Sequence, residues 1–145
     1  SKAFVLRIGS KIMYEDLIKL GLTPRKSLTI NLPKIPKLFF RYFLRGFFDG
    51  DGCVTVSTPK GRASPRIKVI FTGGSLKILL GISKVLRKML STSKGSKHSD
   101  IRNNSHYLIY ARKDSMKILS FIYSGLQKAP YLERKYKIYQ NLRPN

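Results

Sequence analysis

Hydrophobic and polar positions in the first fifty residues predict one strand and two helices. The run AFVLRIG at residues 3–9 predicts a strand, and Ser10 can cap a helix that stops at Gly21. Three prolines in the following stretch, TPRKSLTINLPKIP, exclude a long helix and indicate a connector. Pro36 suits the first turn of a second helix, which the pattern extends to about Asp49.

From Cys53 onward the pattern alternates with period 2 and then returns to helical spacing. The runs CVTVST and RIKVIFT, separated by the polar turn TPKGRASP, predict a β-hairpin. Ser75 can cap the next helix, and the Ser-, Lys- and Asn-rich stretch after it has room for a turn and a short strand. The remaining predicted elements are a strand at 106–111, a helix at 114–125 and a last helix at 131–142.

The strand and helix at 4–18 resemble those at 107–121. FVLRIGSKIM aligns with YLIYARKDSM, and each helix is followed by a short basic signature, PRKS or ERKY. This order indicates an internal repeat, with residues 1–30 as the tail of an earlier repeat and residues 31–145 as a domain of their own. The alternative, that any two strand–helix pairs look alike, stays open.

Charge narrows the class of partner. The chain of 145 residues is 42% hydrophobic, enough for the core of one domain, but it has 29 Lys and Arg against seven Asp and Glu, a formal net charge of +22. Such a field attracts polyanions, so nucleic acid is the expected partner. An anionic membrane is the rival, but the sequence has no apolar run of about 18 residues and no helix with Lys and Arg massed opposite a clean apolar face.

Cysteine and histidine usage excludes two further classes of site. The single Cys53 rules out an intramolecular disulfide and a multi-cysteine zinc site. His98 and His106 lack Cys or acid partners at metal-ligand spacing, so zinc is not expected. With no secretory signal at its start, the chain is expected in a reducing intracellular compartment: a mitochondrion, a chloroplast or a bacterial cytoplasm.

The predicted helix at 37–49 is apolar around most of its surface. Four charged residues at spacing four form one narrow polar stripe: Lys37, Arg41, Arg45 and Asp49. Such a helix must be buried on most of its surface. Gly46 inside it costs about 1 kcal/mol relative to Ala, a cost explained if another helix approaches closely there. The helix therefore predicts a packing seam between two similar units.

Asp49 and Asp51 stand two residues apart in a chain with few acids. With Gly50 and Gly52 they resemble the start of a calcium loop, but the twelfth position holds Lys60 instead of Glu. The residues by themselves leave two interpretations, a metal site or a turn in which Asp and Gly are common.

Residues 44–52, LRGFFDGDG, resemble the signature of the LAGLIDADG homing endonucleases. Gly46, both acids and the final glycine match, whereas Arg45 replaces a small residue and the apolar places are aromatic. The element order from residue 35 on and the segment YLERKY are also similar to one repeat of that family. The resemblance implies an α+β fold, an αββαββα repeat whose saddle-shaped antiparallel sheet carries helices on one face.

The same resemblance implies a site. In that family two motif helices pack side by side and each delivers an acid to one of two adjacent active sites. It makes Asp51 the metal-binding acid, with the Gly50 carbonyl beside it, for Mg²⁺ or another divalent cation such as Mn²⁺, because hard cations take oxygen ligands. Asp49 would shape the helix end. The helix interface implied in this way consists of Phe43, Gly46, Phe47 and Asp49.

A basic residue near the metal usually completes such a site. By its place in YLERKY, Lys135 is the first candidate and Arg134 the second, with Lys26 in PRKS as the counterpart in the earlier repeat. The alternative, that each is a solvated helix charge, stays open.

The predicted hairpin offers a surface for reading DNA. Alternation points Ile67, Val69 and Phe71 toward the core, which leaves the other face for the major groove, where Arg and Lys recognise guanine. Residues at the hairpin tip would suit phosphates. The expected DNA-binding residues are Thr55, Ser57, Lys60, Arg62, Arg66, Lys68, Arg102 and His106.

Together these features predict a site-specific, divalent-metal-dependent endonuclease of the homing type that cuts both strands of a long, intron-type DNA target. One chain supplies one motif acid of this kind, so a second repeat must come from a missing N-terminal half, a separate chain or a homodimer partner. The alternative is an RNA-binding or intron-maturase derivative, part of a ribonucleoprotein, in which cleavage has lapsed. Retention of Asp51 favours the enzyme.

Overall fold

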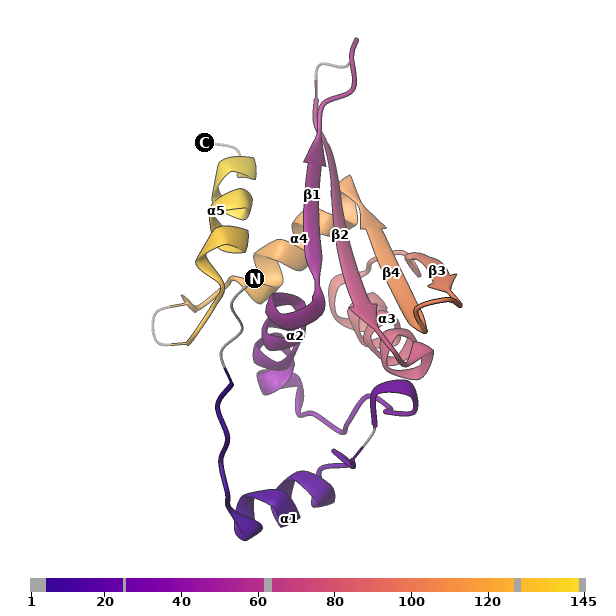
Figure 1. Ribbon diagram of the computed structural model, residues 1–145. Coiled ribbons are helices and arrows are strands. Elements are labelled where there is room, and N and C mark those ends of the chain that lie inside the picture. The colour runs from indigo at the N-terminus through magenta and orange to yellow at the C-terminus, as the bar shows by residue number, and fades with distance from the viewer. Residues whose placement is uncertain (1–4, 25, 62–63, 127–128, 144–145) are drawn as a thin grey trace.

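The computed structural model describes residues 5–24, 26–61, 64–126 and 129–143 (Figure 1). Within them lie five α-helices, one short 3₁₀ helix and four strands. In chain order these are α1 (Lys11–Lys19), η1 (Lys26–Leu28), α2 (Lys37–Asp51), β1 (Cys53–Ser57), β2 (Arg66–Gly73), α3 (Leu76–Leu90), β3 (Ser96–Asp100), β4 (Ser105–Ala111), α4 (Arg112–Ile122) and α5 (Glu133–Leu142).

The four strands form one antiparallel sheet in the order β1-β2-β4-β3. The predicted hairpin is confirmed: Thr55 pairs with Lys68, and Val54 pairs with Val69. Because side chains alternate across a strand, these two pairs face opposite sides of the sheet. Val54 and Val69 are buried, and Thr55 and Lys68 are exposed.

Helices α2, α3 and α4 pack against one face of the sheet, as Figure 1 shows. The predicted α+β fold with helices on one face is confirmed. The core between the layers is aliphatic and aromatic, and its fully buried members include Leu44, Phe48, Val69, Phe71, Ile82, Leu86, Leu108, Tyr110, Ile118 and Leu119. None of the described helices is long and apolar enough to cross a membrane.

The start of the described chain differs from the prediction. Residues 5–9 form no strand and are exposed, because no neighbouring strand supplies the hydrogen bonds that β structure needs. The strand half of the proposed internal repeat is therefore not present in the described residues. The helix that follows is as expected, since the Ser10 hydroxyl accepts a hydrogen bond from the Met13 amide at 3.2 Å and Gly21 has a φ of 84°.

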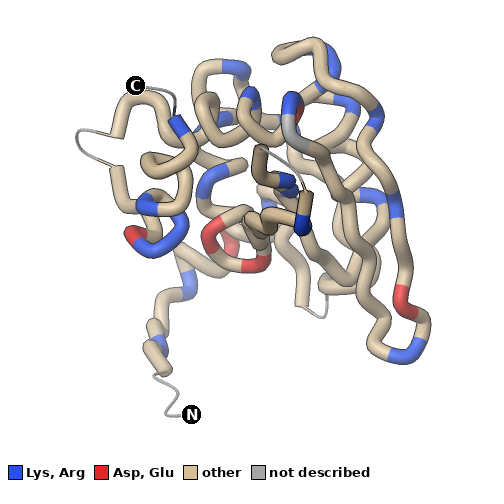
Figure 2. The backbone as a smooth tube through the Cα atoms, turned by 90° about the horizontal axis from the view of Figure 1, so that it is seen from above, with Lys and Arg blue, Asp and Glu red and all other residues tan. Residues whose placement is uncertain are grey.

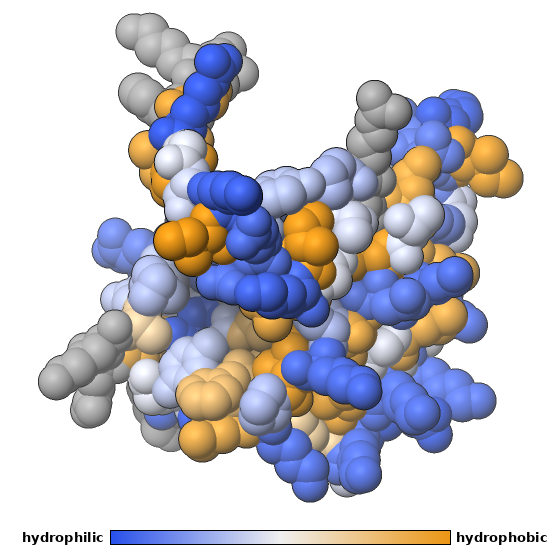
Figure 3. Space-filling view, turned by 90° about the horizontal axis from the view of Figure 1, so that it is seen from below, coloured by the Kyte–Doolittle hydropathy of each residue, from blue (hydrophilic) through white to orange (hydrophobic). Residues whose placement is uncertain are grey.

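Helix α1 stands apart from this core. None of its residues is buried, although several are large and apolar. Figure 3 views the molecule from below, the side on which α1 lies in Figure 1, and shows hydrophobic surface there among hydrophilic side chains. The exposed apolar residues of α1 are Ile12, Met13, Tyr14 and Leu17.

The connector before α2 packs against the beginning of α3. Ser75 occupies the N-cap position, but its hydroxyl does not cap the helix and instead donates to the Ile30 carbonyl at 2.8 Å. At Gly74 a Cβ would lie 2.6 Å from the Ser27 carbonyl oxygen, so only glycine allows this approach. Helix α2 then continues to Asp51, two residues beyond the predicted end at Asp49.

Candidate functional site

Three residues of the polar stripe of α2, Arg41, Arg45 and Asp49, are buried or half-buried, whereas Lys37 is exposed. Arg45 is only 2% exposed, and its guanidinium donates to the Ile122 carbonyl at 2.7 Å and to the Ser124 carbonyl at 3.3 Å. One turn earlier, Arg41 donates to the Ser124 hydroxyl at 3.0 Å. The stripe thus binds the end of α4, where the last carbonyls of a helix have no partners within the helix. Arg45 occupies a place where the family signature has a small residue, and this contact explains it.

The opposite face of α2 is aromatic and exposed. Phe39 and Tyr42 are 55% and 44% exposed, and Gly46 and Gly50 are exposed beside them. No atom of the described chain lies within 4 Å of a Cβ built at Gly46, so within this chain no helix approaches there. Close packing at Gly46 stays a prediction about a second unit.

Asp49 is committed to contacts within the chain. Its carboxylate accepts a hydrogen bond from the Leu132 amide at 2.9 Å and one from the Tyr123 hydroxyl at 3.3 Å. Burial, followed by the neighbouring Asp49 carboxylate, raises the pKa of Tyr123 above its ordinary value. Asp49 therefore lies at the helix end in contact with Leu132 and Tyr123, and its assignment to the helix interface stays a prediction. Phe43 and Phe47 are half-buried, with ring centroids 6.1 Å apart.

Asp51 is the last residue of α2 and is exposed. Among the described residues its carboxylate has no hydrogen bond and no ion pair. It borders a cleft of about 540 Å³ whose wall includes Phe43, Phe47, Thr72 and Ser75. This carboxylate is therefore free to bind an external group.

Lys135, from α5, reaches the same helix end from the other side. Its side chain is 3% exposed, and its ammonium donates to the carbonyls of Phe48 at 2.6 Å, Asp49 at 3.1 Å and Gly52 at 2.5 Å. Burial, and next the positive charge of Arg134, lower the pKa of Lys135 from its ordinary value. Arg134 itself is exposed. Lys26 belongs to η1, and its side chain lies outside the described part of the structure.

The outer face of the sheet matches the predicted reading surface along the hairpin. Thr55 pairs with Lys68 and Ser57 with Arg66, and all four are exposed on the side away from the helices. Lys60 is exposed in the turn, and Arg62 lies outside the described residues. The hairpin therefore presents alternating hydroxyl and cationic groups.

The second strand pair corrects one expectation. His106 pairs with Gly73, two residues from the buried pair of Leu108 and Phe71, so it has the parity of the helix-covered face. Its Nδ1 is 2.7 Å from the Ser99 hydroxyl. The outer face instead carries His98 opposite Tyr107, with ring centroids 5.9 Å apart. Sequence reasoning missed this pair, although the alternation of HYLIYA around its buried residues contained the signal.

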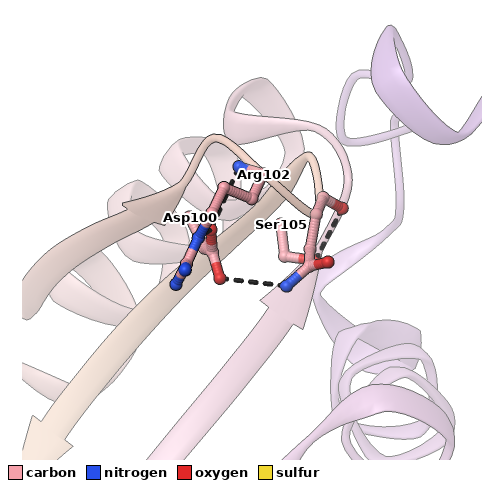
Figure 4. A network of polar contacts seen from close by, with 4 residues as sticks. Asp100, Arg102 and Ser105 are labelled. Carbon is pink, nitrogen blue, oxygen red and sulfur yellow. Dashed lines mark hydrogen bonds and ion pairs between the residues drawn. The ribbon is translucent and has the colours of Figure 1, made fainter.

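Arg102 lies in the turn between β3 and β4, beside Asp100 (Figure 4). The Asp100 carboxylate accepts from the Arg102 amide at 3.1 Å and lies 3.5 Å from the Arg102 Nε. The guanidinium remains 91% exposed. This surface ion pair contributes little to stability, so Arg102 stays available to another anion.

Basic residues surround the molecule and acids are few, as the backbone trace in Figure 2 shows. Within the described chain, ion pairs involve Lys11, Lys19, Arg102 and Lys137. The cations of the hairpin, Arg66 and Lys68, have no acidic partner there. The hairpin part of the outer sheet face thus carries positive charge that no acid of the described chain pairs with, as a phosphate-binding surface requires.

The residues around Asp51 fit part of a divalent-metal site. The described chain contains no group of three or more His, Cys, Asp or Glu that could enclose a metal ion. The Asp51 carboxylate and the Gly50 carbonyl at the exposed helix end are nevertheless hard oxygen donors. Mg²⁺ is commonly bound by one or two carboxylates together with substrate phosphates. The Asp51 carboxylate and the Gly50 carbonyl therefore suit part of a metal site, which ligands from outside this chain would complete.

The fold is similar to those of several solved structures. The chain is similar to the meganuclease I-SmaMI bound to uncleavable DNA, with a TM-score of 0.52 and 19% identity over 94% of this chain and 43% of that one. A mutant of I-SmaMI gives a TM-score of 0.50 and 19% identity over 94% and 45% of the two chains. The homing endonuclease I-TnaI, at 19% identity, covers 71% of this chain and 68% of its own, with a TM-score of 0.44.

The model of the family described as LAGLIDADG endonuclease matches residues 44–144. The chain therefore belongs to the LAGLIDADG endonuclease family, and the resemblance read from its signature is confirmed. Among curated proteins, none matches the sequence. The chain spans less than half the length of the two I-SmaMI chains named above.

Proposed function

We propose that this protein is one half of a divalent-metal-dependent, site-specific DNA endonuclease of the homing type, which cuts phosphodiester bonds in a long, intron-type target. The observation that carries the proposal is the state of Asp51. Of the seven acids, it alone has no polar partner among the described contacts. The others are held by partners within the chain: Glu15, Asp16, Asp49, Asp100, Asp114 and Glu133.

The Asp51 carboxylate has no described partner within a chain whose formal net charge is +22. We therefore expect it to bind a cation from outside the chain. Asp51 and the Gly50 carbonyl would hold Mg²⁺ or Mn²⁺, which when bound readies a water for attack on phosphorus and stabilises the leaving oxygen. The hairpin would lie along the major groove, with Arg66 and Lys68 against guanine edges or phosphates. Arg134, exposed on α5 beside buried Lys135, is a cation that would offset charge near the scissile phosphate.

Cleavage of both strands requires a second unit. The exposed aromatic face of α2 is the surface on which a second motif helix would pack, with Gly46 permitting close approach. The apolar side chains on α1 fit the same proposal, in which residues 1–30 are the tail of a preceding repeat. The second repeat would come from a longer chain, a separate chain or a second copy.

Incubation with a randomised duplex library and Mg²⁺, followed by a search for enriched cut ends, tests the proposal. The wild-type chain, with its partner unit, should yield enriched ends. Asp51→Asn should bind the same sequences without cutting, because the lost oxygen ligates metal and does not hold DNA. Asp16→Asn is the matched control, an exposed acid paired only with Lys19, and should cut like the wild type. Cutting by Asp51→Asn at the normal rate would disprove the assignment.

A second candidate function rests on the cations of α3. Lys77, Lys84, Arg87 and Lys88 are exposed on the helical side, away from the outer sheet face. A duplex on the sheet would not reach them, so they favour an additional or alternative ligand such as structured RNA, as in an intron-maturase derivative. Enrichment of bound sequences without cut ends, together with tighter binding to RNA, is the result that would favour this candidate.

A further inference from the structure

Resting on the function proposed above, we infer that Lys135 is a positioning residue: its ammonium closes the end of α2 and holds Gly50 and Asp51 outward for metal. The sequence resemblance placed Lys135 among the catalytic groups. Its contacts point instead to a role carried out through the backbone of α2.

Lys135 supplies hydrogen bonds to carbonyl groups at the end of α2. The last four carbonyls of an α-helix have no partners within the helix, and a cation is favourable at this end of the helix dipole. Lys135 donates to the Asp49 carbonyl in the last turn, to the Phe48 carbonyl, which also accepts from the Gly52 amide, and to the Gly52 carbonyl just beyond the helix. These carbonyls belong to residues before and after Asp51, so the hydrogen bonds fix the backbone position of Asp51.

The donors of Lys135 are fully used. An ammonium has three N–H donors and no acceptor, and three carbonyls accept them here. The ammonium also lies 4.8 Å from the centre of the Phe48 ring, and the residue is 3% exposed. In this position it offers nothing to a water or a phosphate, whereas its neighbour Arg134 is exposed.

The polar groups at the end of α2 therefore fall into two sets. No described side chain donates to the Gly50 carbonyl or binds the Asp51 carboxylate, and these are the two groups proposed for metal. The carbonyls of Phe48, Asp49 and Gly52 face Lys135. A second tie reinforces the arrangement, because the Asp49 carboxylate accepts from the Leu132 amide at the start of α5. Helix α5 thus orients the metal-binding groups without contacting them.

Two measurements test the role of Lys135, and only one of them involves metal. Amide hydrogen exchange at Gly52, whose N–H donates to the Phe48 carbonyl at 2.9 Å, reports on the helix end. Paramagnetic broadening of the amide signals of residues 50–53 by Mn²⁺ reports binding at Asp51. In Lys135→Met we expect faster exchange at Gly52 and Mn²⁺ affinity lower by about tenfold or more, as for other groups that orient metal ligands.

The variants include a graded series and a matched control. Lys135→Gln keeps two donors and should give exchange and affinity between wild type and Lys135→Met, which keeps the inference testable if the methionine variant does not fold. Lys137→Met, on the same helix, removes only an exposed pair with Glu133 and should change neither measurement. Asp51→Asn should abolish Mn²⁺ broadening and leave exchange at Gly52 as in wild type.

The outcomes separate this inference from the proposed function. If wild type shows no Mn²⁺ broadening, the proposed metal site fails, and exchange at Gly52 still decides whether Lys135 holds the helix end. Unchanged exchange and unchanged Mn²⁺ affinity in both Lys135 variants, with cleavage lost, would overturn the positioning role and return Lys135 to the reacting groups.

Discussion

Beside the apolar face of Phe40, Leu44 and Phe48 that enters the core, helix α2 has two further faces, one charged and one aromatic. The charged side chains of Arg41, Arg45 and Asp49 point inward, where they bind the end of α4 and the start of α5. The aromatic side chains of Phe39 and Tyr42 point outward and are about half exposed. An ordinary amphipathic helix places its apolar stripe against the core and its charges in water.

The difference between the faces shows that α2 serves two interfaces. Its inward charges are worth burying because they satisfy helix-end carbonyls and amides that would otherwise lack partners. Its outward aromatic groups remain about half exposed in this chain, although the Arg45 guanidinium lies 5.4 Å from the centre of the Tyr42 ring, and a face that includes Gly46 and Gly50 suits the approach of another helix. The inward face therefore belongs to the domain, and the outward face to a partner.

Removal of the buried Arg45 guanidinium should lower the free energy of unfolding more than any other change to either face of α2. Arg45→Met keeps the aliphatic part of the side chain but leaves the Ile122 and Ser124 carbonyls without their donor, so the free energy of unfolding should fall by about 3 kcal/mol. Urea denaturation measures the loss. Lys37→Met, in the same stripe but exposed, should be nearly neutral. An equal loss of unfolding free energy in both variants would mean that the hydrogen bonds of Arg45 do not contribute to stability.

A smaller effect should separate the two acids at the helix end. Asp49→Asn weakens the acceptor for the Leu132 amide and the Tyr123 hydroxyl and should lower the free energy of unfolding by about 1.5 kcal/mol. Asp51→Asn should leave stability nearly unchanged, because no described residue forms a hydrogen bond or an ion pair with its carboxylate. The same denaturation experiment compares the two. A stability loss in Asp51→Asn equal to that in Asp49→Asn would contradict the division between structural and metal-binding acid.

The smallest effect on stability should come from the outward face. Gly46→Ala meets no atom within 4 Å, and Ala is the better helix former, so the isolated chain should gain about 1 kcal/mol. The same methyl group should hinder the approach of a partner helix and weaken association. Urea denaturation of wild type and variant measures the stability, and sedimentation measures the association. A variant that is stabilised yet associates normally would remove Gly46 from the interface.

Much of the fold followed from local pattern. The hairpin and the inward face of β2 were predictable because alternation with period 2 leaves only one face of β2 apolar, and Ile67, Val69 and Phe71 are buried as expected. The strand expected at 3–9 is not formed in its described part, since a strand depends on a neighbour that sequence pattern does not reveal. The side of the sheet expected for His106 was wrong, although alternation along β4 puts His106 on the same side as the buried Leu108 and Tyr110.

The amino-acid sequence by itself determined the family, the motif helix and the pair of acids at its end, because these depend on residue types at fixed spacing along one element. Only the tertiary structure decided what each charge does. Asp49, Asp51 and Lys135 are all charged residues near one helix end, and their roles differ through the groups that other elements bring to them. Leu132 and Tyr123 engage Asp49, three carbonyls engage Lys135, and no described group engages Asp51. Burial and hydrogen bonding between distant segments set these differences, and no local pattern contains them.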